Sequence, residues 1–310
     1  MNKSLLSMVI TLVVVFAIVA IGVFFIDPNL EFPIEQATVP ARFLFVGIGL
    51  LIAFAIYYFT RENSAWDVGT RQVVWMAIGA ALYAVFSFLF NGTVFVVPSV
   101  SQVALRPAIA IPMFFGYTFG PVVGFFTGAV GNMFGDAWTG FSLSPQWSIG
   151  NGLVGLISGM PFLFGDKKRS LDTVLWTGGA LALLGAVLYF LNPTQPNTLF
   201  FDTANNIFGD ARITLFAGIS ILVGFVLVLI VRFVFGQNLD IAAAVTWGML
   251  GNILGLGFAA ISDIWINGYS PVVAIVGEFL PAAGPNLIFA AILVPLLVVA
   301  YASVQRQSGR

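Results

Sequence analysis

Long, nearly uncharged apolar runs constrain this chain more than any other feature of its sequence. The first extends from Leu5 to Ile26, and similar runs recur along all 310 residues. A helix needs about 20 apolar residues to cross a bilayer. Only 8% of the residues are charged, whereas a soluble domain carries about 25%. The sequence therefore predicts an all-α fold, a polytopic transmembrane helical bundle in a lipid bilayer.

Composition also limits the folds, catalytic groups and partners that this chain can have. A transmembrane barrel requires strands that alternate apolar and polar residues, and these runs do not alternate. The chain has no histidine and no cysteine, so it lacks the commonest metal ligand, the commonest general base and any thiolate. Its net charge of −1 offers no attraction to nucleic acid. We expect no catalytic residue, metal, cofactor or nucleic-acid partner, and an integral-membrane enzyme is the most distant alternative.

Polar breaks divide the chain into about ten predicted helices. They cover residues 5–26, 41–59, 73–90, 105–119, 122–137, 146–164, 174–191, 213–235, 241–265 and 272–301. The last is predicted to be interrupted near Pro281 to Pro285, and the stretch from Thr93 to Leu105 to form an extended or re-entrant loop. Whether the glycine-rich helix 122–137 spans the bilayer fully is open.

The basic residues give an independent test of this order. If the chain starts inside and crosses at each helix, the inside receives Lys3, Arg61, Arg71, Lys167, Lys168, Arg169, Arg232, Arg306 and Arg310. The outside receives only Arg42, Arg106 and Arg212. This asymmetry is what the positive-inside rule requires. We expect cytoplasmic termini and a multi-pass protein of a prokaryotic plasma membrane.

Two sets of small residues recur at four-residue spacing. Gly116, Gly120, Gly124 and Gly128 form a ladder, and Ala77 and Ala81 lie on one face of the third predicted helix. Small residues at this spacing let another helix backbone approach closely. Each set has two readings, a surface for sliding or assembly and ordinary helix packing.

Charged residues in apolar surroundings are the first candidates for a site. Arg106, at the outer end of the fourth helix, can receive a carboxylate or phosphate, snorkel to the interface, or pair with Asp136. Glu278 lies next to the predicted break in the last helix, where an ionisable residue in a membrane marks a functional site. The alternative places Glu278 at the level of the lipid headgroups.

Aromatic and amide side chains gather near the same outer face. Tryptophans there form an interfacial belt or stack a flat heterocycle. Beside amides, they form the lining of a plausible ligand pocket. The predicted substrate-binding residues are Arg106, Asp136, Trp138, Gln146, Trp147, Asn151, Glu278 and Asn286.

The central stretch resembles a known family. The pattern LRPAIAIPMFFGYTFGPVVGFFTGAVGNMFGD, followed after a short loop by QWSIGNGLVGLISGM, is similar to the S-components of energy-coupling factor (ECF) transporters. The resemblance covers Arg71 to Gly165 well and Val272 to Tyr301 more loosely. S-components as a rule have six helices. We therefore expect an extra N-terminal helix pair in residues 1–60 and an S-component-like membrane domain in 61–310, with an enlarged region at 171–240.

The resemblance implies a function and partners. S-components capture vitamins or related micronutrients from outside and deliver them with a transmembrane coupling subunit and ATP-hydrolysing subunits. The chain has no Walker-type nucleotide-binding loop, so ATP-driven transport needs such a partner. The small-residue pair Ala77 and Ala81 matches the family's motif for docking on the coupling subunit. The pocket would open outward, between the Asn91–Ala104 loop, the Trp138–Trp147 loop and the outer ends of the sixth and last helices.

Two other functions fit the same residues. One is a self-sufficient secondary transporter or channel, in which Glu278, Asp136 and Asp263 couple to an ion. The other is an accessory structural subunit of a membrane complex, in which the extra helices are assembly surfaces. Binding of a flat vitamin-like ligand without an ion gradient would favour the S-component.

Overall fold

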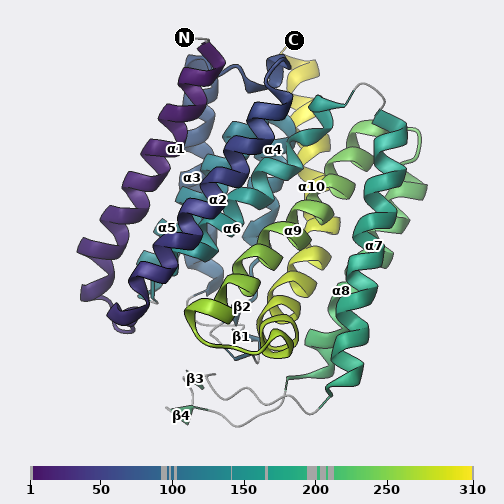
Figure 1. The fold of residues 1–310 in the computed structure, drawn as a ribbon. Coiled ribbons are helices and arrows are strands. Elements are labelled where there is room, and N and C mark those ends of the chain that lie inside the picture. Colours follow the sequence, from purple (N-terminus) through teal and green to yellow (C-terminus); the bar gives the residue numbers. More distant parts are fainter. Residues whose placement is uncertain are drawn as a thin grey trace.

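The protein is a bundle of helices that run roughly side by side (Figure 1). The computed structural model describes residues 3–91, 96–97, 99–100, 103–140, 142–164, 167–193, 201–202, 207–208 and 213–308. In this part of the chain the α-helices are α1 (Lys3–Ile21), α2 (Val39–Thr60), α3 (Thr70–Asn91), α4 (Ala110–Phe119), α5 (Pro121–Thr139), α6 (Pro145–Ser158), α7 (Lys167–Leu191), α8 (Leu215–Val234), α9 (Leu239–Ile266) and α10 (Leu280–Gln307). Their order confirms the all-α prediction.

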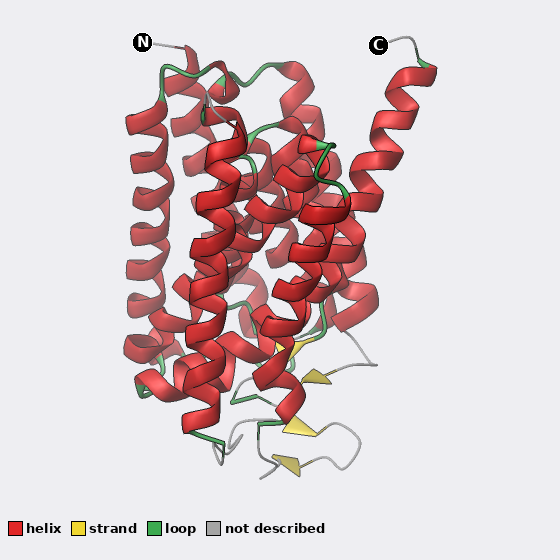
Figure 2. Ribbon diagram, turned by 90° about the vertical axis from the view of Figure 1, so that its right-hand side faces the viewer, coloured by secondary structure: helices red, strands yellow, loops and turns green. Residues whose placement is uncertain are grey.

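Two short hairpins complete the described structure. Strand β1 (Val96–Val97) pairs antiparallel with β2 (Val103–Ala104), and β3 (Phe201–Asp202) pairs antiparallel with β4 (Ile207–Phe208). Both hairpins lie at the end of the bundle opposite the termini (Figures 1 and 2). The rest of the predicted Thr93–Leu105 loop lies largely outside the described residues.

Both chain termini lie at one end, which we call the basic end, and the opposite end is called the site end (Figure 1). The helix bounds place Lys3, Arg61, Arg71, Lys168, Arg169, Arg232 and Arg306 at or near the basic end. They place Arg42 and Arg106 at the site end, while Arg212 and Arg310 fall outside the described residues. This distribution is the one that the positive-inside rule predicts for a bundle whose basic end faces the cytoplasm.

Seven helical segments in the described part of the chain are long and apolar enough to cross a membrane. These include α1, α2, α3, α7, α8, α9 and the segment Val273–Gln307 that contains α10. The three helices α4, α5 and α6 are not among them, and most of their residues are buried. They are enclosed by protein, so their glycine-rich sequences need not face lipid.

Several helices differ from the sequence prediction. Helix α6 ends at Ser158 rather than at 164, α7 begins at Lys167 rather than at 174, and the predicted interruption near Pro281 to Pro285 is wrong. Helix α4 begins later than expected, after a 3-10 turn at Pro107–Ile109, because the residue before a proline disfavours helical backbone. The last helix continues through Pro285, and a π-helical segment at Val273–Phe279 leads into it. Proline is tolerated in membrane helices whose surroundings adjust to the missing backbone donor. Asn252 Nδ2 of α9 donates to the Ala283 carbonyl at 2.8 Å and so ties this part of α10 to α9.

The glycine ladder packs α4 and α5 against α6. A Cβ added at Gly116 or Gly124 would lie 2.0 or 2.2 Å from the carbonyl oxygen of Gly155. One added at Gly128 would lie 2.0 Å from the carbonyl oxygen of Asn151. The ladder is therefore an internal packing surface. Its glycines contact α6 and do not serve only to pack α4 against α5.

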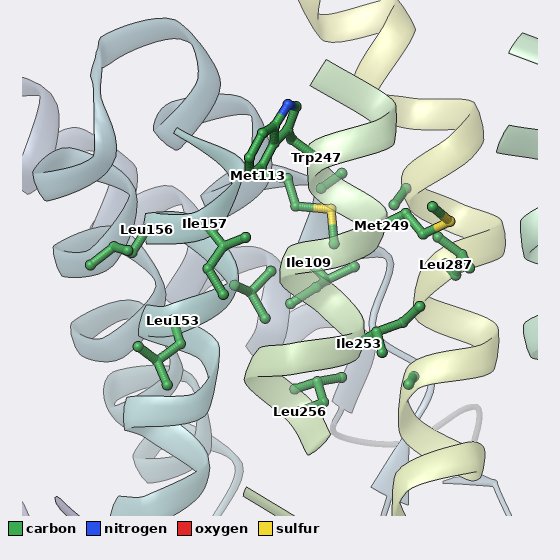
Figure 3. Close-up of a cluster of buried hydrophobic side chains, with 14 of the residues drawn as sticks. Ile109, Met113, Leu153, Leu156, Ile157, Trp247, Met249, Ile253, Leu256 and Leu287 are labelled. Atoms are coloured by element: carbon green, nitrogen blue, oxygen red, sulfur yellow. The ribbon is translucent and has the colours of Figure 1, made fainter. Parts of the chain in front are cut away.

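Larger apolar side chains fill the space between α4, α6, α9 and α10. Figure 3 shows Met113 near Trp247, Met249 near Leu287 on the other side of α9, and further apolar residues of α6 and α9 around them. Close-packed interiors transmit displacement and tolerate little change in volume. The labelled members are Ile109, Met113, Leu153, Leu156, Ile157, Trp247, Met249, Ile253, Leu256 and Leu287.

The N-terminal helix pair packs directly on this core. A Cβ at Gly22, just after α1, would lie 2.9 Å from Met133 Sδ on α5. A Cβ at Gly49 on α2 would lie 2.3 Å from Ile149 Cγ2 on α6. Helices α1 and α2 therefore join the bundle through close contacts with α5 and α6.

Candidate functional site

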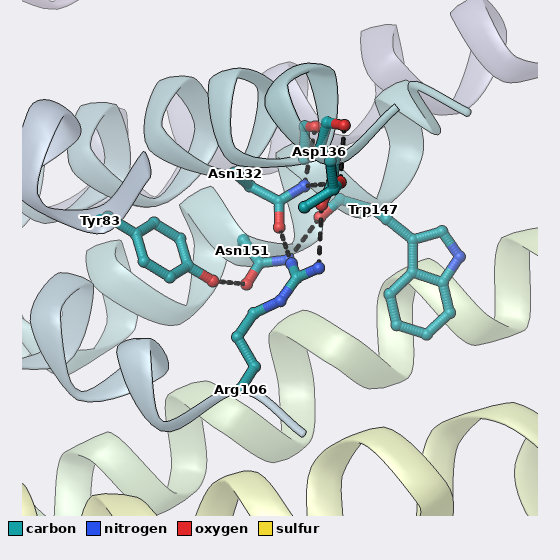
Figure 4. Close-up of polar contacts among 8 residues, drawn as sticks. Tyr83, Arg106, Asn132, Asp136, Trp147 and Asn151 are labelled. Atoms are coloured by element: carbon teal, nitrogen blue, oxygen red, sulfur yellow. Dashed lines mark hydrogen bonds and ion pairs between the residues drawn. The ribbon is translucent and has the colours of Figure 1, made fainter. Parts of the chain in front are cut away.

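A polar cluster lies within the apolar bundle at the site end, between α3, α5 and α6 (Figure 4). Arg106 lies just before α4, and its side chain extends into this polar cluster. Its Nη2 forms an ion pair with Asp136 Oδ1 at 2.9 Å, and its Nη1 donates to Asn132 Oδ1. A charge in membrane-buried protein requires such partners. Of the three roles considered for Arg106, the structure shows pairing with Asp136.

Asn132 connects this ion pair to α6. It lies one helical turn before Asp136, so the two side chains share a face of α5. Asn132 Nδ2 donates to Asp136 Oδ2 at 2.7 Å and to Ser148 Oγ at 3.1 Å. Both carboxylate oxygens of Asp136 thus accept from neighbours, which fixes their direction.

Tyr83 and Asn151 extend the cluster toward α3. The buried Tyr83 hydroxyl donates to Asn151 Oδ1 at 2.7 Å, and Asn151 Nδ2 donates to the Trp147 carbonyl at 2.9 Å. Close packing makes these contacts possible, because a Cβ at Gly131 of α5 would lie 2.8 Å from Tyr83 Cβ. We call Tyr83, Arg106, Asn132, Asp136, Ser148 and Asn151 the arginine cluster.

A second polar network lies on the opposite side of the first turns of α6. Asp263 of α9 accepts three hydrogen bonds, from Gln146 Nε2 at 2.9 Å, Trp147 Nε1 at 2.8 Å and Asn267 Nδ2 at 2.9 Å. Asp263 is 1% exposed. Three N–H donors stabilise a buried carboxylate strongly.

Arg42 of α2 supplies the positive charge of this network. Its Nη1 donates to Gln146 Oε1 at 3.2 Å and Ser144 Oγ at 3.4 Å, and its Nη2 donates to Asn267 Oδ1 at 3.4 Å. We call Arg42, Gln146, Trp147, Asp263 and Asn267 the aspartate network.

Glu278 lies beside the aspartate network in the π-helical segment. It is 0% exposed and close enough to Arg42 and Asp263 for electrostatic interaction. Glu278 is therefore enclosed by protein rather than exposed on the surface of the bundle. Between α9 and this segment, burial and the nearby Glu278 and Asp263 charges raise the pKa of the Tyr269 phenol. That phenol therefore stays neutral.

The remaining predicted residues lie apart from these groups. Trp138 is 52% exposed and its ring lies near Phe88 and Phe134, so it faces out of the bundle. Asn286 is buried on α10, and among the described residues no hydrogen bond links it to either group. The described residues also hold no group of three or more acidic side chains placed for a metal ion.

Helix α3 presents two different small-residue faces. Ala80 and Ala84 are buried toward α5, where a Cβ at Gly131 would lie 2.9 Å from the Ala80 carbonyl oxygen. Ala77 and Ala81 are exposed on the outside of the bundle. The inner pair packs against α5, and the outer pair is not covered by the described part of this chain.

Sequence reasoning did not select Tyr83, Asn132, Ser148, Arg42 or Asn267 for the site. A signal existed for Asn132, which lies four residues before Asp136 on a predicted helix. The others come from segments whose pairing the sequence pattern does not encode.

The comparisons with known proteins match this part of the chain. A family model described as "ECF-type riboflavin transporter, S component" matches residues 67–192, which contain the whole arginine cluster. A UPF0397 protein of Vibrio atlanticus strain LGP32 is 30% identical over 179 residues, which cover 56% of this chain and 94% of that relative. The chain belongs to the S-component family of ECF transporters.

Other relatives align over shorter stretches. A UPF0397 protein of Aliivibrio salmonicida strain LFI1238 is 33% identical over 111 residues, covering 36% of this chain and 57% of the relative. One of Photobacterium profundum is 38% identical over 93 residues, 30% of this chain and 49% of the relative. The chain thus spans about half the length of these two relatives. No solved structure matches.

Membership gives this S-component its general role. It is a multi-pass membrane protein of a bacterial transporter family and a substrate-binding subunit of an ECF transporter. The family is one of transporter components rather than of enzymes.

Proposed function

We propose that this S-component captures a small, vitamin-like micronutrient from the outer side and delivers it with coupling and ATP-hydrolysing subunits. The observation that carries the proposal is the arginine cluster. It is polar and largely buried, it lies at the end opposite the basic residues, and it falls within the matched residues 67–192. A few converging polar groups in apolar surroundings are typical of ligand sites.

The chemistry of the cluster favours a flat heteroaromatic ligand with polar edges. Asn132 and Asn151 carry amide donors and acceptors and Arg106 carries donors in a planar fork, and a ligand would exchange some of the bonds that these groups now make to one another. The Tyr83 ring, whose hydroxyl bonds Asn151, supplies the aromatic surface of the cluster, whereas the Trp147 ring points away from it toward Asp263. The matched family description names riboflavin, a compound of this class, and we propose it as the first ligand to test.

We further propose that the exposed pair Ala77 and Ala81 contacts the coupling subunit. Small residues at four-residue spacing permit close helix approach in a membrane. Their exposure on the outside of α3 leaves this face available. The N-terminal pair in 1–60 and the enlarged region 171–240 would then be additions around an S-component-like unit.

Ligand binding by the purified protein tests the proposal directly. Riboflavin fluorescence is titrated with the protein in detergent without an ion gradient, and small molecules that co-purify are identified by mass spectrometry. We expect quenching that saturates at one ligand per chain, or a co-purified compound of the same chemical class. Absence of any heteroaromatic ligand in both measurements would contradict the proposed substrate class.

The buried Asp263 and Glu278 favour a second candidate, an ion-coupled transporter. Buried acidic residues in membrane helices are common in ion pathways. Uptake by vesicles that contain this chain alone, driven by an imposed ion gradient, would support this alternative and overturn the importer proposal.

A further inference from the structure

The N-terminal helix pair contributes charged side chains to the site end. Helices α1 and α2 precede the matched residues 67–192, yet Arg42 of α2 and Asp27, which follows α1, are both buried. Burying a charge is unfavourable unless partners compensate for the lost hydration. The hydrogen-bond partners of Arg42 and Asp27 indicate how the N-terminal helix pair acts on the site end.

Arg42 determines which way the Gln146 amide faces. An amide has one acceptor end and one donor end. Arg42 Nη1 donates to Gln146 Oε1 at 3.2 Å, which directs Gln146 Nε2 to Asp263 Oδ1 at 2.9 Å. Asp263 Oδ2 in turn accepts from Trp147 Nε1 at 2.8 Å. A chain of oriented bonds therefore runs from α2 to the indole of Trp147.

The same guanidinium is itself held in a fixed direction. Its Nε donates to Thr38 Oγ1 at 2.8 Å, and its Nη2 donates to Asn267 Oδ1 at 3.4 Å. The Arg42 side chain is 7% exposed. Because all three of its nitrogens donate hydrogen bonds, the Arg42 guanidinium has little freedom to rotate.

Asp27 holds the connection that leads into α6. Its Oδ1 accepts from the Leu143 backbone N–H at 2.7 Å, and its Oδ2 accepts from the Ile34 N–H at 2.9 Å. Asp27 and Arg42 together bond Leu143, Ser144 and Gln146.

We propose that Arg42 is a positioning residue for the substrate site, supplied by the N-terminal helix pair. It fixes the start of α6 against α9 and so orients Trp147, whose carbonyl holds Asn151 of the arginine cluster. The inference rests on the substrate-capturing function proposed above. The helix pair is then part of the site rather than an accessory.

A cysteine introduced at Leu143 tests the proposal without a known ligand. The chain has no cysteine, and Leu143 is fully buried, so a maleimide reaches Leu143→Cys only when this connection opens. Purified protein in detergent is labelled in the parent and Arg42→Gln backgrounds. We expect Arg42→Gln to increase the labelling rate at least tenfold and to weaken riboflavin binding about tenfold. Arg42→Lys keeps the positive charge but loses the planar guanidinium, so its labelling rate and riboflavin affinity should lie between those of the parent and Arg42→Gln.

A second cysteine separates positioning from general destabilisation. Leu171→Cys is equally buried but lies near the start of α7 at the basic end. If Arg42 only stabilises the fold, both sites become more reactive in Arg42→Gln, and that result overturns the proposal. An unchanged rate at Leu143→Cys also overturns it. Failure of the parent protein to bind riboflavin counts against the proposed ligand, while labelling still decides the role of Arg42.

Discussion

At the scale of single residues, the arginine cluster depends on one ion pair. Arg106 and Asp136 compensate each other in surroundings that would otherwise disfavour both charges. Asn132 bonds both partners, so removing either charge disturbs three side chains.

A double-mutant cycle measures this pair. We expect Arg106→Gln and Asp136→Asn each to lower stability and riboflavin affinity, and the double variant to lose less than the sum. Residues in one polar network couple by about 0.5–3 kcal/mol, and we expect the upper half of that range. Thermal unfolding in detergent and riboflavin titration provide the two measurements.

The second ion pair among the described residues serves as the control. Arg232 and Asp172 lie 3.2 Å apart at the basic end, and Asp172 is largely exposed. The side chain of Arg232 is 14% exposed and that of Asp172 53%, so solvent screens one partner of this pair. Exposed pairs contribute about 0–1 kcal/mol, and we expect weaker coupling between Arg232→Gln and Asp172→Asn than in the Arg106–Asp136 cycle, with unchanged ligand affinity. Equal coupling in the two cycles would mean that burial of the arginine cluster has no energetic effect.

The sequence predicted part of the site at this scale. Pairing of Arg106 with Asp136 was among its alternatives, because a carboxylate in a membrane needs a partner. The aspartate network was not predicted, because its residues come from α2, α6 and α9 and helical periodicity does not say which faces meet. Trp138 faces outward because α5 continues through Thr139, which places Trp138 on the same face as the exposed Phe134.

At the scale of elements, backbone contact between α4, α5 and α6 holds the centre together. Gly155 lies against both Gly116 and Gly124, where no side chain has room. Spacing in the sequence showed that a helix would approach the ladder closely. It did not show that α6 was that helix, because the ladder carries no information about its partner.

Single alanine substitutions test this packing. Gly124→Ala adds one methyl group at 2.2 Å from a backbone oxygen, and we expect a loss of about 1–3 kcal/mol or more. Gly47→Ala on α2 adds the same group where nothing lies within 4 Å, and it should be neutral or stabilising by up to about 1 kcal/mol. Thermal unfolding compares the two, and equal effects would refute the packing role of the ladder.

The outer face of α3 gives a separate prediction. Ala77→Leu combined with Ala81→Leu adds bulk to an exposed surface, so folding and ligand affinity should remain unchanged. We expect co-purification with a tagged coupling subunit to fall at least tenfold. Ala17→Leu with Ala180→Leu, exposed positions on α1 and α7, forms the matched control. Unchanged co-purification of the Ala77/Ala81 variant would contradict docking through this face.

At the scale of the whole molecule, the helix order and the positions of the basic residues agree. Apolar runs and charged breaks are local signals, which is why the ten-helix order was predictable. The burial of α4, α5 and α6 was not, because it depends on how distant helices assemble.

Transport by the whole molecule should require its partners. Vesicles containing this chain alone should bind riboflavin without accumulating it, and accumulation should appear when coupling and ATPase subunits are added with ATP inside the compartment that the basic end faces. Glu278→Gln should leave this ATP dependence intact. Gradient-driven accumulation that Glu278→Gln abolishes would instead establish ion coupling.

The position of α6 between the two polar groups has a thermodynamic consequence. Ser148 and Asn151 belong to one group, Gln146 and Trp147 to the other, and all four lie within two helical turns. A ligand that shifts this stretch changes the free energy of the contacts behind it. If a ligand binds best when Arg42 and Asp263 keep this arrangement, linkage requires that the ligand and the arrangement stabilise each other by the same factor. Ligand affinity at one face of α6 would then report the order of the contacts at the other.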